Sequence, residues 1–184
     1  MGRPKPLLPW HGVTLVEYQI ASLIDAGVSQ VIVVLGHEHE AIAPHVSGDG
    51  VHSVMNVQYR QGKATSVRAG LTAVDTAATD ILLLAVDQPR PAKIVAAIVS
   101  GHEESSALIT APRYRGRGGH PLVFSASLRS ELEAITEDHQ GIRALFKTHP
   151  NDITEVPIDD PIVCLDLNTP EEYEIARSRY GELL

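Results

Sequence analysis

The stretch Ile81-Leu82-Leu83-Leu84-Ala85-Val86-Asp87-Gln88-Pro89 is a continuous apolar run of strand length that ends at an acidic residue. A strand buried on both faces, as in a parallel sheet, has such a sequence because neither of its faces meets water. A second run of the same kind, Val31–Leu35, lies earlier in the chain. The two runs predict the core of an α/β fold.

Amphipathic segments of helical period alternate with the apolar runs. Thr14 and Glu17 have the spacing of a capping box, and apolar residues then recur at helical intervals until Gly27. Further strands are predicted at His52–Asn56, Ala107–Ala111, Pro121–Phe124, Thr154–Ile158 and Ile162–Leu165, and further helices at Glu38–Val46, Thr65–Val74, Pro91–Ser100, Ser125–Thr136, Gln140–Thr148 and Pro170–Gly181. The alternation predicts a three-layer α/β/α architecture with a mostly parallel sheet. Since no repeat or linker interrupts residues 1–184, we expect one domain.

The composition is that of an ordinary folded protein, with 43% hydrophobic and 21% charged residues among 184. A formal net charge of −8 argues against nucleic acid and anionic membranes as partners, because both need a basic face. No apolar run approaches the roughly 18–20 residues of a transmembrane helix. The single cysteine, Cys164, favours a reducing cytoplasm as the location.

Acidic residues follow two of the predicted strands, where ligands bind in an open parallel sheet. Asp87 can present its carboxylate to a hard cation held against phosphates, or it can cap the next helix. Asp166 ends the run Ile162–Leu165, and Asn168 would point to the same side of an extended stretch. Asp87 and Asp166 would pair if their strands were neighbours. Thr169, in contrast, is predicted to be the N-cap of the last helix.

Two loops have sequences suited to anionic ligands. The segment Asn56–Gly70 contains Gly62 and then small hydroxyl residues, so that its backbone N–H groups can face an anion or a base edge. It is equally well read as an ordinary loop with Thr65 or Ser66 as N-cap. The segment Pro112–Pro121 holds three arginines and three glycines. Arginine forks match phosphate and carboxylate oxygens, although a solvated surface loop is the alternative reading.

Taken as an ordered set, these segments resemble the MobA-like nucleotidyltransferase family and, within it, the molybdenum cofactor cytidylyltransferases. The matching segments span nearly the whole chain in the family's order: Met1–Leu8, Val33–His37, Asn56–Gly70, Asp87–Pro89, Gly119–Pro121 and Leu165–Pro170. The pair Pro4-Lys5 is similar to the cytidylyl-type branch of the family.

The resemblance implies a Rossmann-like fold of the nucleotide-diphospho-sugar transferase type. It implies that CMP moves from CTP, or another NTP, to a phosphorylated pterin with Mg²⁺ as cofactor and pyrophosphate as product. The implied site residues are Lys5 and Asp87 for catalysis, with Lys5 on the triphosphate; Asp87, Asp166 and Asn168 for the metal; Asn56, Gly62 and Ser66 for the nucleotide; and Arg113, Arg117, Gly119 and His120 for the acceptor. A phosphomonoester acceptor, whose second pKa is about 6, needs no general base.

The start of the chain departs from the family pattern. Relatives place an apolar strand and a loop of the form Leu-Ala-Ala-Gly-x-Gly-x-Arg before the segment that here begins at Met1. We expect Met1 to be an internal methionine of a longer reading frame; a shortened protein is the alternative. Two other functions stay open: transfer to another phosphorylated metabolite, such as a sugar phosphate, and a non-catalytic nucleotide-binding module.

Overall fold

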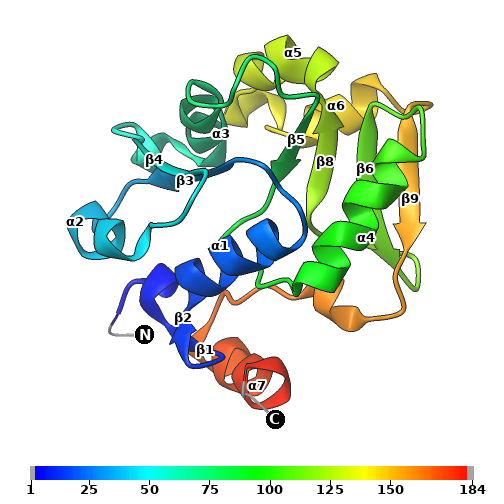
Figure 1. The fold of residues 1–184 in the computed structure, drawn as a ribbon. Helices are drawn as coiled ribbons and strands as arrows, with labels where there is room; N and C mark the ends of the chain where they lie inside the picture. The colour runs from blue at the N-terminus through cyan, green and yellow to red at the C-terminus, as the bar shows by residue number, and fades with distance from the viewer. Residues whose placement is uncertain (1–2, 182–184) are drawn as a thin grey trace.

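The computed structural model describes residues 3–181, so Met1 and Gly2 of the N-terminal motif lie outside the described residues. Strands and helices alternate as predicted (Figure 1). The helices are α1 Leu15–Asp25, α2 His39–Ile42, α3 Lys63–Leu71, α4 Ala92–Glu103, α5 Arg129–Ala134, α6 Arg143–Thr148 and α7 Pro170–Tyr180. The strands are β1 Pro9–Trp10, β2 Val13–Thr14, β3 Val31–Leu35, β4 Val51–Met55, β5 Asp80–Leu83, β6 Ile109–Tyr114, β7 Arg117–Gly118, β8 Leu122–Ser125 and β9 Ile153–Pro157.

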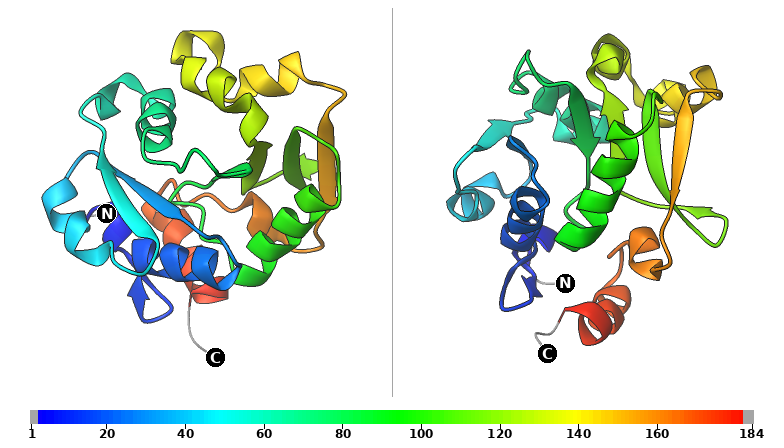
Figure 2. Two further views of the ribbon diagram at one scale, coloured as in Figure 1. Left: turned by 45° about the horizontal axis from the view of Figure 1, so that its top comes forward. Right: turned by 45° about the vertical axis from the view of Figure 1, so that its right-hand side comes forward.

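Helices cover both faces of the larger sheet, which confirms the three-layer α/β/α prediction. Apolar residues of α3, α5 and α6 pack with Ile81, Ile109 and Phe124 of the strands in one core cluster. Helix α4 lies on the opposite face, where its His102 contacts Thr110, the residue after Ile109 on β6. Because successive strand residues point to opposite faces, these contacts place the helices in separate layers (Figure 2).

The strand directions correct one part of the prediction. Strands β3 and β4 are parallel, as are β6 and β9, but β5–β8, β8–β6 and β6–β7 are antiparallel. The sheet order is β5-β8-β6-β7 with β9 beside β6, so the larger sheet is mixed rather than mostly parallel. The physical reason is the tight connection at Arg115 and Gly116, since a parallel pair needs a crossover of about a dozen or more residues.

The two apolar runs are less buried than predicted. Strands β3 and β4 form a sheet separate from the five-stranded one, and among residues 3–181 no strand pairs with the second edge of β3 or of β5. Consequently Ile32–Val34 and Leu82–Val86 are only half-buried, although their sequences suit strands covered on both faces. The ladder of β5 also ends at Leu83, and the chain continues outside a strand to Asp87.

Local capping explains where other elements begin. The predicted capping box at Thr14 and the predicted N-cap at Thr169 are both present, so α1 and α7 begin as expected, and Thr169 also forms a capping box with Glu172. The predicted strand Ile162–Leu165 is wrong, because Pro161–Cys164 form a 3₁₀ helix. The Asp160 carboxylate accepts a hydrogen bond from the Ile162 N–H at 2.9 Å and caps that turn.

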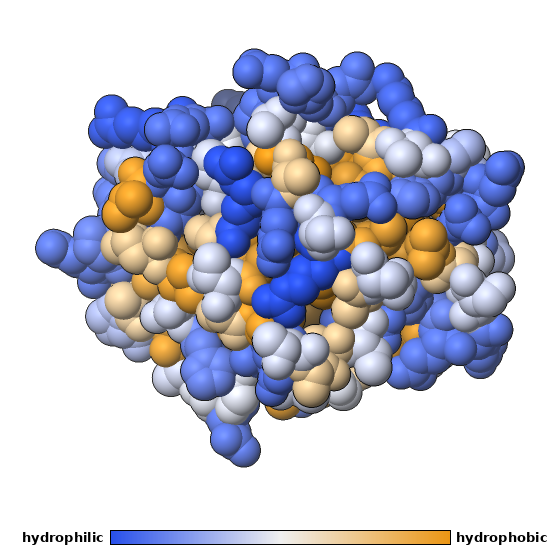
Figure 3. All heavy atoms as spheres, turned by 90° about the horizontal axis from the view of Figure 1, so that it is seen from above, coloured by the Kyte–Doolittle hydropathy of each residue, from blue (hydrophilic) through white to orange (hydrophobic). Residues whose placement is uncertain are grey.

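The N-terminal segment and the C-terminal helix pack together (Figure 2). Leu8 and Trp10 share a buried cluster with Leu167 and Tyr173, and the Tyr173 hydroxyl donates to the Pro9 carbonyl at 2.7 Å. Within the described part of the chain, no helix is long and apolar enough to cross a membrane. On the face seen from above, small apolar patches interrupt a mainly hydrophilic surface (Figure 3).

Candidate functional site

An ion pair joins the N-terminal segment to the end of the β5 run. The Lys5 ammonium lies 3.1 Å from a carboxylate oxygen of Asp87, with side-chain exposures of 34% and 20%. Lys5 opens the short 3₁₀ helix Lys5–Leu7, and Leu8 anchors it in the core. The structure therefore brings together the two residues for which the resemblance implies catalytic roles, although they lie 82 positions apart in the sequence.

Asp166 lies on a loop directly beside the loop of Asp87. The Leu167 N–H donates to the Asp87 carbonyl at 2.9 Å, and the Gln88 amide donates to the Asp166 carboxylate at 2.6 Å. These hydrogen bonds place the two loops next to each other, although Asp87 and Asp166 do not lie on neighbouring strands as the prediction required. Asn168 is exposed, and its backbone N–H donates to Glu172 at 2.9 Å.

The donor set fits Mg²⁺ that shares its coordination sphere with a nucleotide. Within residues 3–181, no group of three or more His, Cys, Asp or Glu side chains is placed to hold a metal ion by itself. The carboxylates of Asp87 and Asp166 lie on adjacent loops, and both side chains reach solvent. Mg²⁺ typically takes one or two carboxylates and completes its shell with phosphate oxygens and water.

Asn56 organises the loop that precedes α3. Its buried side-chain amide donates to the hydroxyls of Thr65 at 2.9 Å and Ser66 at 3.0 Å, while its oxygen accepts from the Gln58 N–H at 2.9 Å. The structure therefore brings Asn56 and Ser66 together, as the resemblance implies for nucleotide-binding residues. The Asn56 side chain holds the shape of the loop through these bonds.

Helix α3 begins earlier than predicted, because Gly62 rather than Thr65 or Ser66 occupies the N-cap position. Gly62 has φ +108°, and a Cβ there would overlap the side chain of Glu137. The Glu137 carboxylate accepts a hydrogen bond from the Ala64 N–H at 2.7 Å and so caps the helix from a distant segment. Sequence reasoning missed Glu137, since no local pattern links it to a helix 73 positions away.

The arginine-rich segment divides into an exposed and an interior part. Arg113 donates through Nε at 2.8 Å and through Nη2 to the Glu155 carboxylate, and these hydrogen bonds raise its pKa. Arg117 is exposed on β7. Gly119 is buried; its N–H donates to the Pro112 carbonyl at 3.0 Å.

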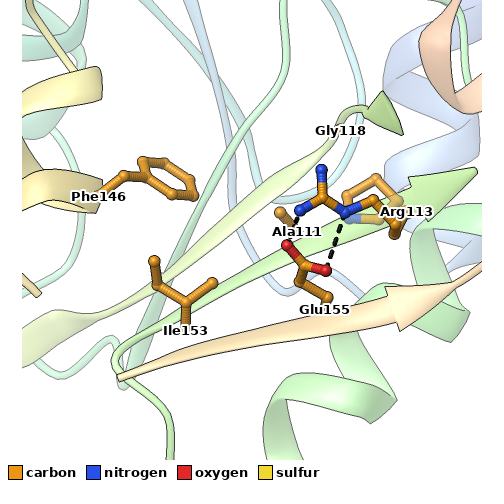
Figure 4. A pocket seen from close by; sticks show the side chains of 7 residues that line it. Ala111, Arg113, Gly118, Phe146, Ile153 and Glu155 are labelled. Carbon is orange, nitrogen blue, oxygen red and sulfur yellow. Dashed lines mark hydrogen bonds and ion pairs between the residues drawn. The ribbon is translucent and has the colours of Figure 1, made fainter. Parts of the chain in front are cut away.

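The ion pair of Arg113 and Glu155 lies at one end of a pocket of about 350 Å³, and Phe146 and Ile153 lie at the other (Figure 4). The full lining is Ala111, Pro112, Arg113, Gly118, Phe146, Ile153 and Glu155. Among the described residues, no hydrogen bond or ion pair joins Arg113 or Arg117 to Asp87. The structure therefore places the four residues of the expected acceptor site in two different settings.

His120 belongs to the interior part. Its N–H donates to the Val163 carbonyl at 2.9 Å, and its own carbonyl accepts from Arg90 at 2.9 Å. Burial lowers the pKa of the His120 imidazole below 6.5, and the positive charge of Arg90 lowers it further. His120 is therefore neutral at neutral pH and can donate or accept a hydrogen bond without carrying charge.

The fold is an α/β fold in which Asp87 and Asp166 lie on adjacent loops outside the strands. Residues 1–153 match the MobA-like NTP transferase domain, and the chain belongs to this family of nucleotidyltransferases. Nicotine blue oxidoreductase of Paenarthrobacter nicotinovorans is 29% identical over 195 residues, covering 98% of this chain and 88% of the relative. The molybdenum cofactor cytidylyltransferase of Escherichia coli is 25% identical over 185 residues, covering 100% of this chain and 92% of the relative.

Solved structures share the fold closely. A manganese complex of a Mycobacterium tuberculosis protein has a TM-score of 0.80 and 30% identity, covering 95% of this chain and 91% of that one. A nucleotidyl transferase from Methanothermobacter also has a TM-score of 0.80, with 25% identity over 95% of this chain and 84% of that one. The Rossmann-like fold expected from the sequence is thereby confirmed.

Proposed function

We propose that this protein is a Mg²⁺-dependent cytidylyltransferase that moves CMP from CTP to a phosphorylated pterin and releases pyrophosphate. The observation that carries the proposal is the Lys5–Asp87 ion pair at 3.1 Å, with Asp166 on the adjacent loop. A cation paired with one carboxylate, with a second carboxylate on the adjacent loop, suits a triphosphate that is bound together with a metal ion. The proposal treats residues 1–184 as one domain acting in a reducing cytoplasm.

The reaction needs little beyond positioning and charge stabilisation. An oxygen of the acceptor phosphomonoester attacks the α-phosphorus of CTP, the bond from that phosphorus to the bridging oxygen breaks, and pyrophosphate leaves with the electron pair. Lys5 would bind the triphosphate, and Asp87, Asp166 and Asn168 would hold Mg²⁺, which neutralises phosphate charge. The acceptor is largely dianionic at neutral pH because its second pKa is about 6, so no side chain has to remove a proton.

The remaining candidate residues would determine which substrates bind. Asn56, Gly62 and Ser66 would contact the ribose or base, because they shape the loop and the N-terminus of α3. Gly119 and His120 would border the acceptor next to the Asp166 loop, since both backbones pack against Val163. Arg113 and Arg117 would offer positive charge to the acceptor at the protein surface.

The choice of CTP and of a pterin rests on similarity. The Escherichia coli relative is named for cytidylyl transfer to the molybdenum cofactor, and the Pro4-Lys5 pair is similar to that branch. The relative from Paenarthrobacter is named for an oxidation–reduction reaction, so the assay must include that possibility. The manganese bound to the mycobacterial structure supports a divalent cation in the same fold.

The test measures pyrophosphate release from CTP, GTP and ATP with Mg²⁺, each with molybdopterin, a sugar phosphate or no acceptor. We expect release with CTP and molybdopterin only. Asp87→Asn should lower the rate about 10²–10³-fold, as expected when one electrostatic group is removed from such a site. Asp49→Asn, which neutralises an exposed aspartate at another position, is the matched control and should leave the rate unchanged.

Three outcomes would contradict all or part of the proposal. Undiminished release by Asp87→Asn would show that Asp87 does not act in the transfer. Absence of release with every nucleotide and acceptor, together with turnover of nicotine blue, would favour the kind of reaction for which the Paenarthrobacter relative is named. Release with a sugar phosphate alone would keep nucleotidyl transfer and correct the acceptor.

A further inference from the structure

Arg90 is a cation that the proposed reaction does not use, and it is completely buried, with 0% exposure. Its guanidinium donates hydrogen bonds to backbone carbonyls alone. Nε donates to His120 at 2.9 Å, Nη1 to Pro89 at 3.0 Å, and Nη2 to Val163 and Leu165, each at 2.9 Å. In the described part of the chain, no carboxylate lies within ion-pair distance of it.

These carbonyls belong to three segments that are distant in the sequence. Pro89 follows Asp87, Val163 and Leu165 precede Asp166, and His120 closes the arginine-rich segment. One planar side chain therefore bonds simultaneously to the loops that carry both acidic site residues. A guanidinium has five N–H donors in a fixed fork, so the positions of the carbonyls are fixed relative to one another.

Gln19 of α1 holds the Arg90 backbone in turn. The Gln19 amide donates to the carbonyls of Ala85 at 3.0 Å and Gln88 at 2.9 Å, and its oxygen accepts from the Arg90 N–H at 3.2 Å. Gln19 is itself buried. The loop after β5 is thus fixed from one side by α1 and from the other by the Val163–Leu165 segment.

Arg90 remains charged in this setting. Burial lowers the pKa of the guanidinium to about 10, and Asp166 is the largest of the negative charges that oppose this effect. At neutral pH the group is protonated, and its charge attracts the nearby carboxylates of Asp166 and Asp87. A buried cation that is satisfied by carbonyl dipoles alone is costly to keep, which a purely structural apolar residue would avoid.

We propose that Arg90 is a positioning residue that holds the Asp87 and Asp166 loops at the spacing needed for a divalent cation and a nucleotide. This inference rests on the proposed function in assigning that cation to Asp87 and Asp166. Arg90 does not touch the reacting atoms; it acts through the loops. Groups that orient metal ligands typically change metal affinity about 10–100-fold when they are replaced.

The chain offers a matched control in Arg129. Its guanidinium also donates to three backbone carbonyls, those of Leu71 at 2.6 Å, Val74 at 3.0 Å and Asp75 at 3.2 Å. These carbonyls end α3 and begin the following loop, away from Asp87 and Asp166. Arg90→Lys and Arg129→Lys therefore both replace a carbonyl-binding fork by an ammonium, but only one of the two forks holds the site.

The experiment combines amide hydrogen exchange with Mn²⁺ binding measured by electron paramagnetic resonance in the presence of CTP. Arg90→Lys should accelerate exchange at the Leu167 and His120 amides and weaken Mn²⁺ binding about tenfold or more. Arg129→Lys should accelerate exchange at the Val74 and Ala78 amides, which donate to Leu71 and Asp75, and change Mn²⁺ binding by less than about twofold. Thermal unfolding of both variants measures the loss of stability that each substitution causes, so that this loss can be compared with the change in Mn²⁺ binding.

The result that overturns the inference is equal Mn²⁺ affinity in the two variants, or unchanged exchange at Leu167 and His120 in Arg90→Lys. Should Arg90→Lys not fold, Gln19→Leu loosens the same loops without altering the buried charge and should give the same exchange pattern. If the unmodified protein binds no Mn²⁺ with CTP and releases no pyrophosphate, the proposed function fails, whereas the exchange pattern still decides whether Arg90 holds the loops.

Discussion

The regions around Arg90 and Arg113 differ in burial and in the groups that the two arginines bind. Arg90 is buried and binds backbone carbonyls of three segments. Arg113 lies on β6 with its side chain 38% exposed, and it is paired with Glu155, whose side chain is 48% exposed. The first side chain fixes the backbone around the site, whereas the second forms an ion pair that water can replace.

The difference shows which region can adapt to a ligand. Breaking the Arg90 bonds removes donors from carbonyls around a buried side chain, and an unmet buried acceptor is costly. Breaking the Arg113–Glu155 pair returns both groups to water at little cost. We therefore expect a rigid nucleotide and metal site beside an acceptor region that rearranges when its ligand binds.

The largest expected effect comes from Arg90→Met compared with Arg113→Met. Arg90→Met should lower the free energy of unfolding by about 3–5 kcal/mol, because it removes the hydrogen-bond donor of the Pro89, His120 and Leu165 carbonyls. Arg113→Met should lower it by less than about 1 kcal/mol. Urea unfolding of the two variants measures both values, and similar losses would show that the two regions do not differ as described.

A smaller effect is expected from two neighbouring glycines. A Cβ on Gly119 would overlap the Val163 carbonyl oxygen, which also accepts from Arg90, so Gly119→Ala must shift the loops of the site. A Cβ on Gly118 meets only the end of the Arg113 side chain, at 3.8 Å. We expect Gly119→Ala to cost about 1–3 kcal/mol, as overpacking does, and Gly118→Ala to stay within about 0.5 kcal/mol. Thermal unfolding separates them, and equal melting temperatures would contradict the rigid packing at Gly119.

The sequence allowed most of the fold to be predicted where local chemistry determines it. The capping box at Thr14, the N-cap at Thr169 and the apolar run of β3 are signals contained within a few residues. The antiparallel course of β8 was missed, because strand direction depends on pairing between distant segments. Pro161–Cys164 was misread as a strand, since its apolar residues suit either structure and Asp160 decides the outcome by capping.

The candidate site was predictable only in part for the same reason. Lys5 and Asp87 could be chosen because they lie in motifs, and the structure joins them directly. Arg90 stands in no motif, and a single arginine after Gln88-Pro89 looks like a surface residue until the carbonyls around it are known. The number of arginines between residues 113 and 117 predicted a site for an anionic ligand. In the structure, Arg113 is already paired with Glu155.

A pH titration tests whether Arg90 acts electrostatically on its surroundings. The pKa of His120 lies below 6.5, first because of burial and then because of Arg90. The unfolded chain therefore binds this proton more readily, so the stability due to neutral His120 is present above pH 6.5 and is lost as the pH falls through the folded-state pKa. Arg90→Met should raise that pKa while burial keeps it below 6.5. NMR titration of the imidazole measures the pKa of His120. The control variant, Arg113→Met, should leave this pKa unchanged. A His120 pKa that Arg90→Met does not alter would contradict the electrostatic role of Arg90.

The smallest expected effect concerns the exposed pair and follows from proposing that Arg113 meets the acceptor. Glu155→Gln removes the negative charge that is paired with Arg113, so Arg113 becomes available to an anionic acceptor. The KM for that acceptor should fall by less than about fivefold, and kcat should not change. The matched control is Glu133→Gln, which frees Arg129 from an ion pair of 3.2 Å on α5. Steady-state kinetics at low and high salt measure the change, which should shrink at high salt because exposed charges are screened. A KM that stays constant in Glu155→Gln, or falls equally in Glu133→Gln, would remove Arg113 from the acceptor site and leave that role to Gly119 and His120.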